Sequence, residues 1–542
     1  MDIYKDDGVI TVSVENNDVD GNKDIKSTKD SKATGNIINY SFIPIDKSAV
    51  YINNNDEYRQ HMYKIASNYI IALCITNNVL HLVTERQEYY VIYLNKVNRD
   101  NLEFILNHDI VKKVCFNISE IPNGIKKTNV MDLQFVLKVL LLKEFNSDRE
   151  MFSYFGITER SIGNICTKAY NYIELAKKIN IFVEKNKLNR YLYLEGEIRN
   201  ILLATTNKGF PINVEMYKDY IDSLEEEYKE VEKQNINFND KNKLLEYLNR
   251  NNKYLSLHPE ILRGEDKDLY EWLMIYKSYK VHNNITLNDD TIQIDYDTYN
   301  LRTLNIKEHF TPNSSYYTNV MDVIEGSYKG LYFKILAELT RNKEFIMEAS
   351  KGSFLEYIST RIGIARGNAN SNHEIIANMF LEAYANNIFD RVNIVKYIYK
   401  YWHTYISSDD ADNINKLFYD KMPEFMNFLK SFDGTSDEYS RYNTKIFHPK
   451  TNLHFYIMQI KNLIYKTAIK YVNSAINDFN AKYKDNMIQF GGILDGKLVL
   501  LSEKEHSNIA IDILNRYMAD AYKRYIKKTK YLNATEVIKI KR

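Results

Sequence analysis

The two most informative stretches of this chain are SYKGLYFKILAELTRNKEFI (residues 327–346) and MIQFGGILDGKLVLLSEKE (residues 487–505). In the second stretch, two apolar runs flank Asp495 and Gly496, and Asp-Gly between apolar runs is a strong signal for a hairpin turn. The first stretch overlaps the end of YYTNVMDVIEGS (316–327), which has strand character, and then spaces its apolar residues as a helix does. We therefore expect a strand that leads into a helix, then further helices and a late β-hairpin.

Helices are also expected upstream, because the chain has helical periodicity over most of the region from Asn164 to Tyr279. Apolar residues recur at i, i+3, i+4 and i+7 in IELAKKINIFVEKNK, LEGEIRNILLATTNKG and VEMYKDYIDSLEEEYKEVEKQ. Gly209-Phe210-Pro211 separates the last two runs, since Gly ends one helix and Pro opens the next segment. These runs predict a long antiparallel helix pair that projects from a globular body.

The amino-terminal part of the chain has a different pattern. Residues 1–38 are polar, small and charged, and we expect them to form a flexible tail. Three short β-branched runs follow, YIIALCI (69–75), NVLHLVT (78–84) and YYVIYL (89–94), and they predict consecutive strands. Helical spacing returns in DLQFVLKVLLLKEF (132–145). The pattern predicts a small α/β unit.

The charge balance and the cysteine content exclude several classes of protein. The chain has 542 residues, with 72 Lys plus Arg against 71 Asp plus Glu, so its formal net charge is +1. This excludes a histone-like polycation and an acidic tail protein, although a local basic groove is compatible with it. Three widely separated cysteines, Cys74, Cys115 and Cys166, indicate a reducing compartment and no disulfide framework.

The sequence also bears on where the protein works. Its amino terminus lacks a basic segment followed by an apolar stretch, and no run of about 18 apolar residues occurs. We therefore expect a cytoplasmic protein with no membrane partner. The 45 tyrosines and 7 prolines follow A/T-rich codon usage, which fits a phage or another AT-rich genome.

The order of these elements resembles that of family A DNA polymerases, the bacterial polymerase I type. The resemblance implies an α/β multidomain fold, in which a ribonuclease H-like 3′-5′ exonuclease-like domain precedes a right-hand palm, fingers and thumb. The implied domains are a flexible tail (1–38), a vestigial exonuclease-like domain (39–160), a helical connector (161–192), thumb-like helices (193–292) and palm with fingers (293–542).

The palm stretches carry the resemblance most clearly. Residues 327–346 align without a gap onto the family's motif A, DYSQIELRVLAHLSGD, and the motif A-like segment is 327–334. The residues in register are Tyr328, Leu336, Ala337 and Leu339. The hairpin 487–505 aligns onto motif C, VHDELVLE, and puts Asp495 at the catalytic aspartate.

Two helices add to the resemblance. MQIKNLIYKTAIKYV (458–472) is similar to the helix that starts IQGTAADLMK in the family, with Gln459 in place. The expected fingers helix, 372–385, keeps Phe380 and Tyr384 at the family's aromatic positions. These two aromatic residues are implied to be a vestigial nucleotide-binding site, although aromatic residues on a helix more often pack in a core.

The chain departs from the family at the residues that carry the chemistry. Two-metal phosphoryl transfer needs two palm carboxylates that bridge metals about 3.5–4 Å apart. The motif A position is Ser327, and a hydroxyl does not replace a carboxylate ligand on a hard cation. The nearby acids Asp322 and Glu325 would need a register shift to take its place. Asn372 and Ile376 stand where the family has the Arg and Lys that grip the triphosphate.

The remaining carboxylates have structural interpretations. Asp495 is what any Asp-Gly hairpin would use, and we favour the turn interpretation because its motif A partner is missing. The exonuclease chemistry wants an Asp-x-Glu on the first strand and two further Asp residues, but the strand offers Ala72 and Cys74. Asp132 is the one exonuclease carboxylate that the resemblance places, and an Asp at a helix start is typical of an N-cap. We expect no exonuclease activity and no metal site.

Nucleic-acid binding is a property that the resemblance leaves in place. The last 22 residues are strongly basic and could track phosphates, or they could form a solvated helix face. Arg302 lies near the family's minor-groove arginine, and Lys334 replaces the Arg of motif A. The candidate nucleic-acid-binding residues are Arg302, Lys334, Gln459, Lys523, Arg524, Lys527 and Lys528.

Three hypotheses follow. The first is a catalytically degenerate family A polymerase homologue without a cofactor, which binds primer–template DNA or other nucleic acid, or scaffolds replication or repair partners. The second is an active but divergent DNA polymerase that uses Asp495 with Asp322 or Glu325 and requires Mg²⁺. The third is a protein-interaction component on a reused polymerase fold, since a fold by itself does not imply a function.

Overall fold

The computed structural model describes 43–45, 47–121, 129–141, 143–157, 164–234, 236–248, 255–282, 285, 287–288, 291–297, 301–303, 321–364, 372–432, 452–483, 487–494, 496–527 and 535–539. The described residues form two compact units, an amino-terminal unit that ends at Tyr193 and a carboxy-terminal unit that begins at Leu194. Helix α7 (Asn189–Lys208) runs across this boundary. Among the described residues, the search for a helix with the length and apolar character of a membrane span found none.

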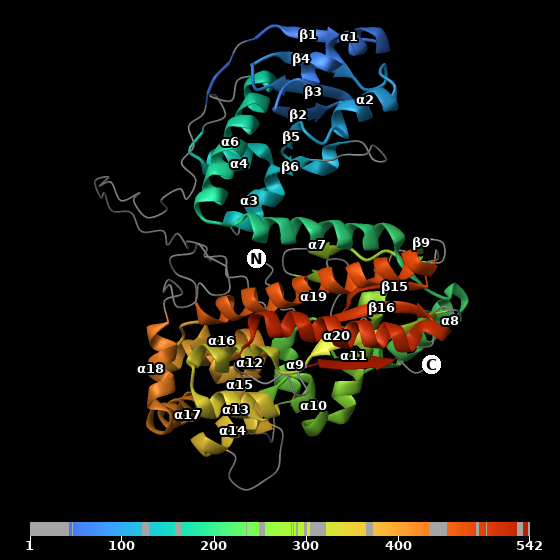
Figure 1. Ribbon diagram of the computed structural model, residues 1–542. Coiled ribbons are helices and arrows are strands. Elements are labelled where there is room, and N and C mark those ends of the chain that lie inside the picture. The colour runs from blue at the N-terminus through green and yellow to red at the C-terminus, as the bar shows by residue number, and fades with distance from the viewer. Residues whose placement is uncertain are drawn as a thin grey trace, which may run out of the picture. The chain divides into compact units, whose positions relative to one another are not determined.

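The amino-terminal unit is built on a six-stranded mixed sheet (Figure 1). Its strands are β1 (Ala49–Ile52), β2 (Ile70–Thr76), β3 (Val79–Thr84), β4 (Tyr89–Tyr93), β5 (Lys112–Cys115) and β6 (Val130–Asp132), in the order β1-β4-β3-β2-β5-β6. β2, β3 and β4 form an antiparallel meander, while β5 lies parallel to β2 and β6 parallel to β5. The three strands expected from the β-branched runs are therefore confirmed.

Helices pack against this sheet and complete the unit. They are α1 (Asn55–Ala66), α2 (Arg99–Leu106), α3 (Leu133–Leu141), α4 (Asp148–Tyr154) and α6 (Ile165–Lys185), with a 3₁₀ turn at Ile118–Glu120. α6 falls in the segment expected to be a helical connector, and it packs against β2, β3 and β5. Its side toward the sheet is apolar and buried, which makes α6 an integral part of the unit's core.

The carboxy-terminal unit begins with helices that the periodicity predicts. After α7 come α8 (Val214–Glu232), α9 (Lys241–Leu248), α10 (Pro259–Glu265) and α11 (Lys267–His282), and α8 packs against α11. Gly209 ends α7 with a φ of +69°, and a Cβ there would lie 2.7 Å from Thr291 Cβ. Short strands connect this region to the rest of the unit: β7 (Phe210–Pro211), β8 (Leu255–Ser256), β9 (Leu287–Asn288), β10 (Thr291–Ile292), β11 (Tyr296–Asp297) and β12 (Arg302–Thr303).

A four-stranded antiparallel sheet forms the centre of this unit. Its strands are β13 (Met321–Tyr328), β15 (Ile488–Leu494), β16 (Lys497–Glu503) and β17 (Thr535–Lys539), in the order β15-β16-β13-β17. The predicted hairpin is β15–β16, and the predicted strand that leads into a helix is β13 followed by α12 (Leu331–Thr340). Both predictions are confirmed. A 3₁₀ turn (Lys504–His506) leads from β16 into α20 (Ser507–Tyr525), which packs on the sheet.

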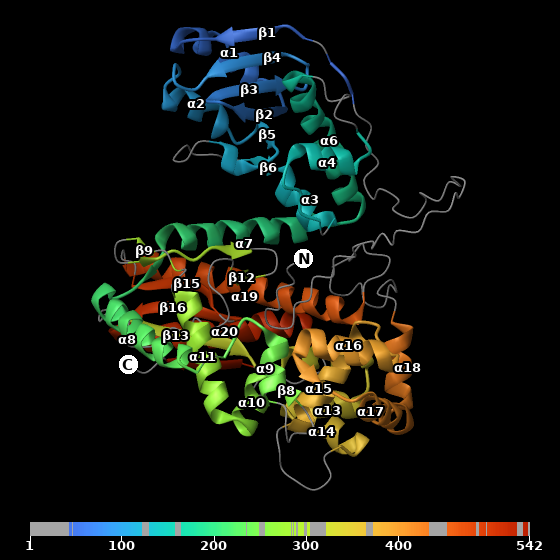
Figure 2. The same ribbon diagram turned by 180° about the vertical axis from the view of Figure 1, so that it is seen from behind.

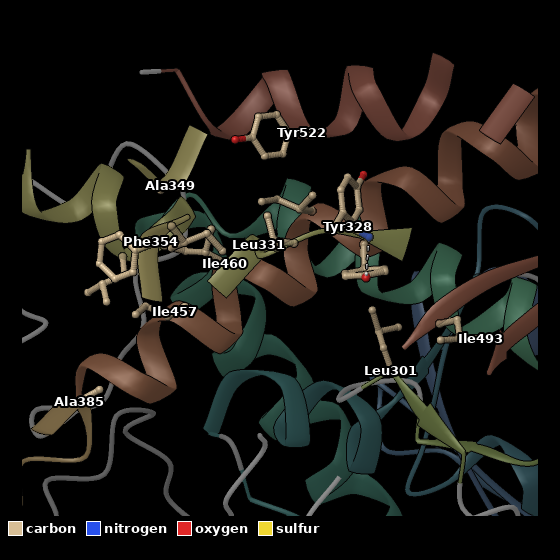
Figure 3. Packing of buried hydrophobic residues seen from close by; sticks show 14 of the residues in the cluster. Leu301, Tyr328, Leu331, Ala349, Phe354, Ala385, Ile457, Ile460, Ile493 and Tyr522 are labelled. Atoms are coloured by element: carbon tan, nitrogen blue, oxygen red, sulfur yellow. Dashed lines mark hydrogen bonds between the residues drawn. The ribbon is translucent and has the colours of Figure 1, made fainter. Parts of the chain in front are cut away.

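The rest of this unit is helical. The long helix α19 (Leu453–Tyr483) lies beside α20 in both views (Figures 1 and 2). The other helices are α13 (Lys343–Lys351), α14 (Phe354–Ile362), α15 (Asn372–Ala385), α16 (Arg391–Trp402), α17 (Ser408–Lys421) and α18 (Pro423–Ser431), and the two-residue strand β14 (Thr404–Tyr405) pairs with β8. Figure 3 shows part of the continuous apolar core, in which Tyr328, Leu331 and Tyr522 join sheet, α12 and α20.

Candidate functional site

Strand β13 presents its acidic and hydroxyl side chains on two opposite faces. Successive residues of a strand alternate, so Glu325 and Ser327 share one face while Asp322 and Tyr328 share the other. The second face is covered by α20: Tyr328 donates a hydrogen bond to the Met518 carbonyl at 2.8 Å, and Ser507 donates one to the Asp322 carboxylate. Of the two acids that we named as substitutes for a motif A aspartate, only Glu325 therefore lies on the face of Ser327.

Glu325 already has a cationic partner within the protein. Its side chain is 7% exposed, and its Oε2 lies 2.9 Å from Lys497 Nζ. Lys497 is the first residue of β16, directly after the hairpin turn, and β16 pairs with β13. The face that carries Ser327 thus carries an ammonium group that neutralises the nearest carboxylate. Sequence reasoning missed Lys497, because nothing in the hairpin pattern shows which strand residue a lysine will reach.

Asp495 itself lies outside the described residues. Its neighbours Leu494 and Gly496 are described, and Leu494 pairs with Lys497 across the end of the hairpin. Gly496 has a φ of +68°, which is the left-handed conformation that tight turns require. The turn is therefore where the Asp-Gly signal predicted it, and a catalytic role for Asp495 stays a prediction.

The two aromatic residues of α15, which we expected to be a fingers helix, are core residues. Phe380 and Tyr384 are 0% exposed. Phe380 stacks on Phe418 of α17, with ring centroids 6.1 Å apart, and the Tyr384 hydroxyl donates to Asn415 Oδ1 at 2.9 Å. Because α17 covers both rings in this structure, they offer no open platform for a base. Their nucleotide-binding role stays a prediction.

The candidate nucleic-acid-binding residues fall into two groups. Lys334 and Gln459 are buried, at 2% and 8% exposed, and burial lowers the pKa of Lys334 to about 8. Lys523, Arg524 and Lys527 are exposed at the end of α20 and just beyond it. The side chain of Arg302 and all of Lys528 lie outside the described part of the chain. The exposed lysines and arginine are the ones that a nucleic acid can reach in this fold.

Aromatic side chains lie among those exposed cations. Arg524 Nη1 donates to the Tyr471 hydroxyl at 2.8 Å, and the Arg516 guanidinium lies 5.5 Å from the centroid of the Tyr517 ring. The Tyr471 and Tyr517 rings are 6.5 Å apart, which links α19 to α20. We call this the α19/α20 surface, and it comprises Tyr471, Arg516, Tyr517, Asp520, Lys523, Arg524 and Lys527. We attributed the tyrosines to codon usage, which is why Tyr471, Arg516 and Tyr517 were missed.

A buried ion pair fixes the start of the carboxy-terminal unit. Lys466 of α19 lies 2.7 Å from both carboxylate oxygens of Glu195, and both side chains are 1% exposed. One turn further along α19 and two residues further along α7, Lys470 lies 2.5 Å from Glu197 Oε2. Glu195 belongs to LEGEIRNILLATTNKG, the stretch that resembles the opening of the family's thumb. These pairs fasten α7 to α19.

In the amino-terminal unit, the Asp132 carboxylate accepts hydrogen bonds from two backbone N–H groups. Its Oδ1 accepts the Phe135 N–H at 2.9 Å and its Oδ2 accepts the Ile118 N–H at 3.1 Å. The first bond is that of an N-cap for α3, and the second ties down the loop after β5. The N-cap interpretation of Asp132 therefore describes its contacts in this structure.

A polar cluster beside β2 was not anticipated from the sequence. Lys168 Nζ of α6 lies 2.7 Å from Asp148 Oδ2, and Tyr172 donates to the same oxygen at 2.7 Å. The charge of Lys168 also opposes the rise in the pKa of the Cys74 thiol on β2 that burial causes. Burial opposes the charged form of Asp148, but the bonds from Lys168 and Tyr172 outweigh it and lower its pKa. Partial burial and the charge of Asp148 raise the pKa of Glu120 to about 7.

Within the described residues, no three His, Cys, Asp or Glu side chains are grouped so that they could hold a metal ion. Asp148 and Glu325 are each paired with a lysine, Asp322 accepts a hydrogen bond from a hydroxyl, and Asp132 accepts from backbone N–H groups.

Comparison with known proteins identifies the fold. No family model matches the sequence, and no curated protein matches it. Among solved structures, the chain is similar to the POL domain of Pol1 from M. smegmatis, solved in complex with DNA primer-template and dNTP. The similarity has a TM-score of 0.64 and covers 90% of this chain and 98% of that chain, at 11% sequence identity. The protein thus has a polymerase-domain fold of the bacterial polymerase I type, as the order of its elements predicted.

Proposed function

We propose that this chain is a catalytically degenerate homologue of family A DNA polymerases, which binds primer–template DNA or other nucleic acid without extending it. One observation carries the loss of catalysis: β13 has Ser327 at the motif A position, and Lys497 neutralises the adjacent Glu325 at 2.9 Å. A divalent cation at this face would have to displace the ammonium or bind beside it, and like charges repel strongly at such distances. The two-metal mechanism lacks its shared carboxylate here.

The amino-terminal unit fits the same proposal as a vestigial ribonuclease H-like exonuclease-like domain. Its support is a mixed sheet that passes from an antiparallel meander into parallel strands, with helices packed on it. Cys74 replaces an expected acid on β2, and Asp132 is engaged with backbone N–H groups. Neither residue belongs to a group of three or more potential metal ligands among the described residues.

Nucleic-acid binding is assigned to the α19/α20 surface. Exposed cations attract the phosphate backbone by releasing its counterions, and aromatic rings beside them can stack on unpaired bases. The surface combines four cationic side chains with the rings of Tyr471 and Tyr517. These rings contact each other and are held by Arg524 and Arg516. The M. smegmatis protein was solved with primer-template, which supports DNA as the partner of this fold.

The experiment is a gel shift with a primer–template at several salt concentrations. We expect the double variant Lys523→Glu, Arg524→Glu to lower the affinity at least tenfold and to reduce the salt slope by about 2, since each lost phosphate contact removes nearly one counterion. Its matched control is Arg59→Glu, Lys96→Glu in the amino-terminal unit, where both residues are exposed. Equal losses in the two variants would count against the α19/α20 surface.

An active but divergent polymerase is the alternative that one observation favours: Glu325 lies on the same face of β13 as Ser327. That polymerase would use Glu325 with Asp495 and would require Mg²⁺. It predicts primer extension that Glu325→Gln abolishes. A chain that neither binds nor extends the primer–template would instead act through protein partners, as a scaffold on a reused fold.

A further inference from the structure

We propose that Lys168 occupies, as a built-in cation, the place beside β2 where an exonuclease domain of this fold would hold divalent metal. The residues present do not fit a metal: on β2 the expected Asp-x-Glu is Ala72 and Cys74. The expectation of a metal ion rests on the proposed function, in which the amino-terminal unit is a vestigial exonuclease-like domain. The contacts that carry the inference are those of the chain's own residues.

The position of the ammonium is the first step. α6 packs across β2, β3 and β5 and carries Lys168, whose charge opposes the rise in the pKa of the Cys74 thiol; Cys74 stands where a metal-binding acid is expected. On its other side, Lys168 Nζ is 2.7 Å from Asp148 Oδ2. The side chains of this pair are only 20% and 24% exposed, so solvent screens their attraction incompletely.

The second step is that two of the surrounding carboxylates, Asp148 and Asp132, already accept hydrogen bonds. Asp148 accepts from both Lys168 and Tyr172, and Tyr172 is fully buried. Asp132 accepts from two backbone N–H groups. A hard divalent cation needs six or more oxygen ligands, so it could bind only by breaking these bonds. The ammonium group of Lys168 neutralises Asp148, so the cluster needs no bound metal ion.

The carboxy-terminal unit has the same replacement, which is the third step. Beside Ser327, Lys497 lies 2.9 Å from Glu325, where the polymerase chemistry would need a metal. In each unit, one lysine therefore pairs with one carboxylate at the position where a catalytic metal ion is expected. The fold of the amino-terminal unit should accordingly depend on Lys168 and be indifferent to divalent ions.

The test is thermal unfolding of the full chain with and without millimolar Mn²⁺, together with Tb³⁺ luminescence sensitised by Tyr172. We expect no effect of Mn²⁺ on the wild type. Lys168→Met should lower the melting temperature by roughly 5–10 °C, because it leaves Asp148 without its cation. Mn²⁺ should not restore that loss, and Tb³⁺ should stay dark, because Ala72 and Cys74 supply no carboxylate to hold a metal ion. The matched control is Lys177→Met, a more exposed ion-paired lysine on the same helix, which should change neither reading.

Should Lys168→Met fail to fold, the double variant Lys168→Met, Asp148→Asn serves instead, because it removes both charges. We expect it to fold and to ignore Mn²⁺. Saturable Tb³⁺ binding by the wild type that Asp148→Asn abolishes would overturn the proposal. So would a Lys168→Met protein whose melting temperature is restored by Mn²⁺, because the residues present would then fit a metal. These readings involve no nucleic acid, so they are independent of the proposed binding function.

Discussion

Several charged side chains are buried in the helices of the carboxy-terminal unit, where each needs a partner. Lys334 of α12, Lys466 of α19 and Glu338 are almost completely buried, and each sits in a helix of the carboxy-terminal unit. Burial of an ionised group is costly unless a partner satisfies it. The Lys466–Glu195 pair meets that condition with two bonds of 2.7 Å, so it can be tested by removing one partner at a time.

We predict that Lys466→Met lowers the free energy of unfolding by about 3–5 kcal/mol, because it leaves the Glu195 carboxylate buried without its cation. The matched control is Lys470→Met, which breaks the neighbouring, one-third exposed pair with Glu197 and should cost less than about 1 kcal/mol. Denaturant unfolding measures both values. A Lys466→Met, Glu195→Leu double variant should recover most of the loss, and equal effects of the two single variants would contradict the prediction.

His282 gives a pH dependence whose sign the structure determines. Its Nδ1 lies 2.9 Å from the Tyr217 hydroxyl, and burial lowers its pKa to about 4. The unfolded chain takes up a proton at this residue near pH 6.5, whereas the folded chain does so only near pH 4. The free energy of unfolding should therefore fall as the pH drops through this window, by up to about 3 kcal/mol at pH 4.

The measurement is urea unfolding at several pH values between 7 and 4 for the wild type and His282→Gln. The variant should show a flatter dependence over this window, because a glutamine takes up no proton. An unchanged slope in His282→Gln would show that other groups carry the dependence.

At the scale of elements, local sequence signals predicted the β15–β16 hairpin, whereas the side chains that meet around it are determined by tertiary contacts. The Asp-Gly turn and the apolar runs of 487–505 are local, so β15 and β16 follow from the sequence. The partner of Glu325 does not, because Lys497 is 172 residues away along the chain. The pairing of Lys168 with Asp148 does not follow from the sequence either, because no local pattern relates the two residues. Nor does the burial of Phe380 and Tyr384 under α17.

The β-bulge of β15 yields a sharp prediction about two glycines. Gly492 has a φ of +113°, and a Cβ there would lie 1.8 Å from the Tyr296 hydroxyl oxygen. We expect Gly492→Ala to lower the free energy of unfolding by about 3 kcal/mol, from backbone strain and the steric clash. Gly196→Ala in α7 is the control, since nothing lies within 4 Å of its Cβ. It should stabilise the helix by about 0.5–1 kcal/mol. Similar losses in both variants would contradict the strained position of Gly492.

At the scale of the whole molecule, the order of elements was more informative than any single motif. The chain is only 11% identical to the M. smegmatis domain, and yet 90% of it superimposes on that fold with a TM-score of 0.64. Apolar periodicity and turn signals survive such divergence, because they depend on residue classes. Single side chains carry no such signal: Ser327 is visible in the sequence, whereas the Lys497–Glu325 pair beside it is visible only in the structure.

We propose that the polymerase fold has been kept and its chemistry lost. A primer-extension assay with all four nucleotides, Mg²⁺ or Mn²⁺ and a primer–template that the chain binds in a gel shift tests it most directly. We predict binding without addition of a single nucleotide, because β13 offers Ser327 and a lysine-paired Glu325. Extension by the wild type that disappears in Asp495→Ala and in Glu325→Gln would contradict the claim and identify a working polymerase.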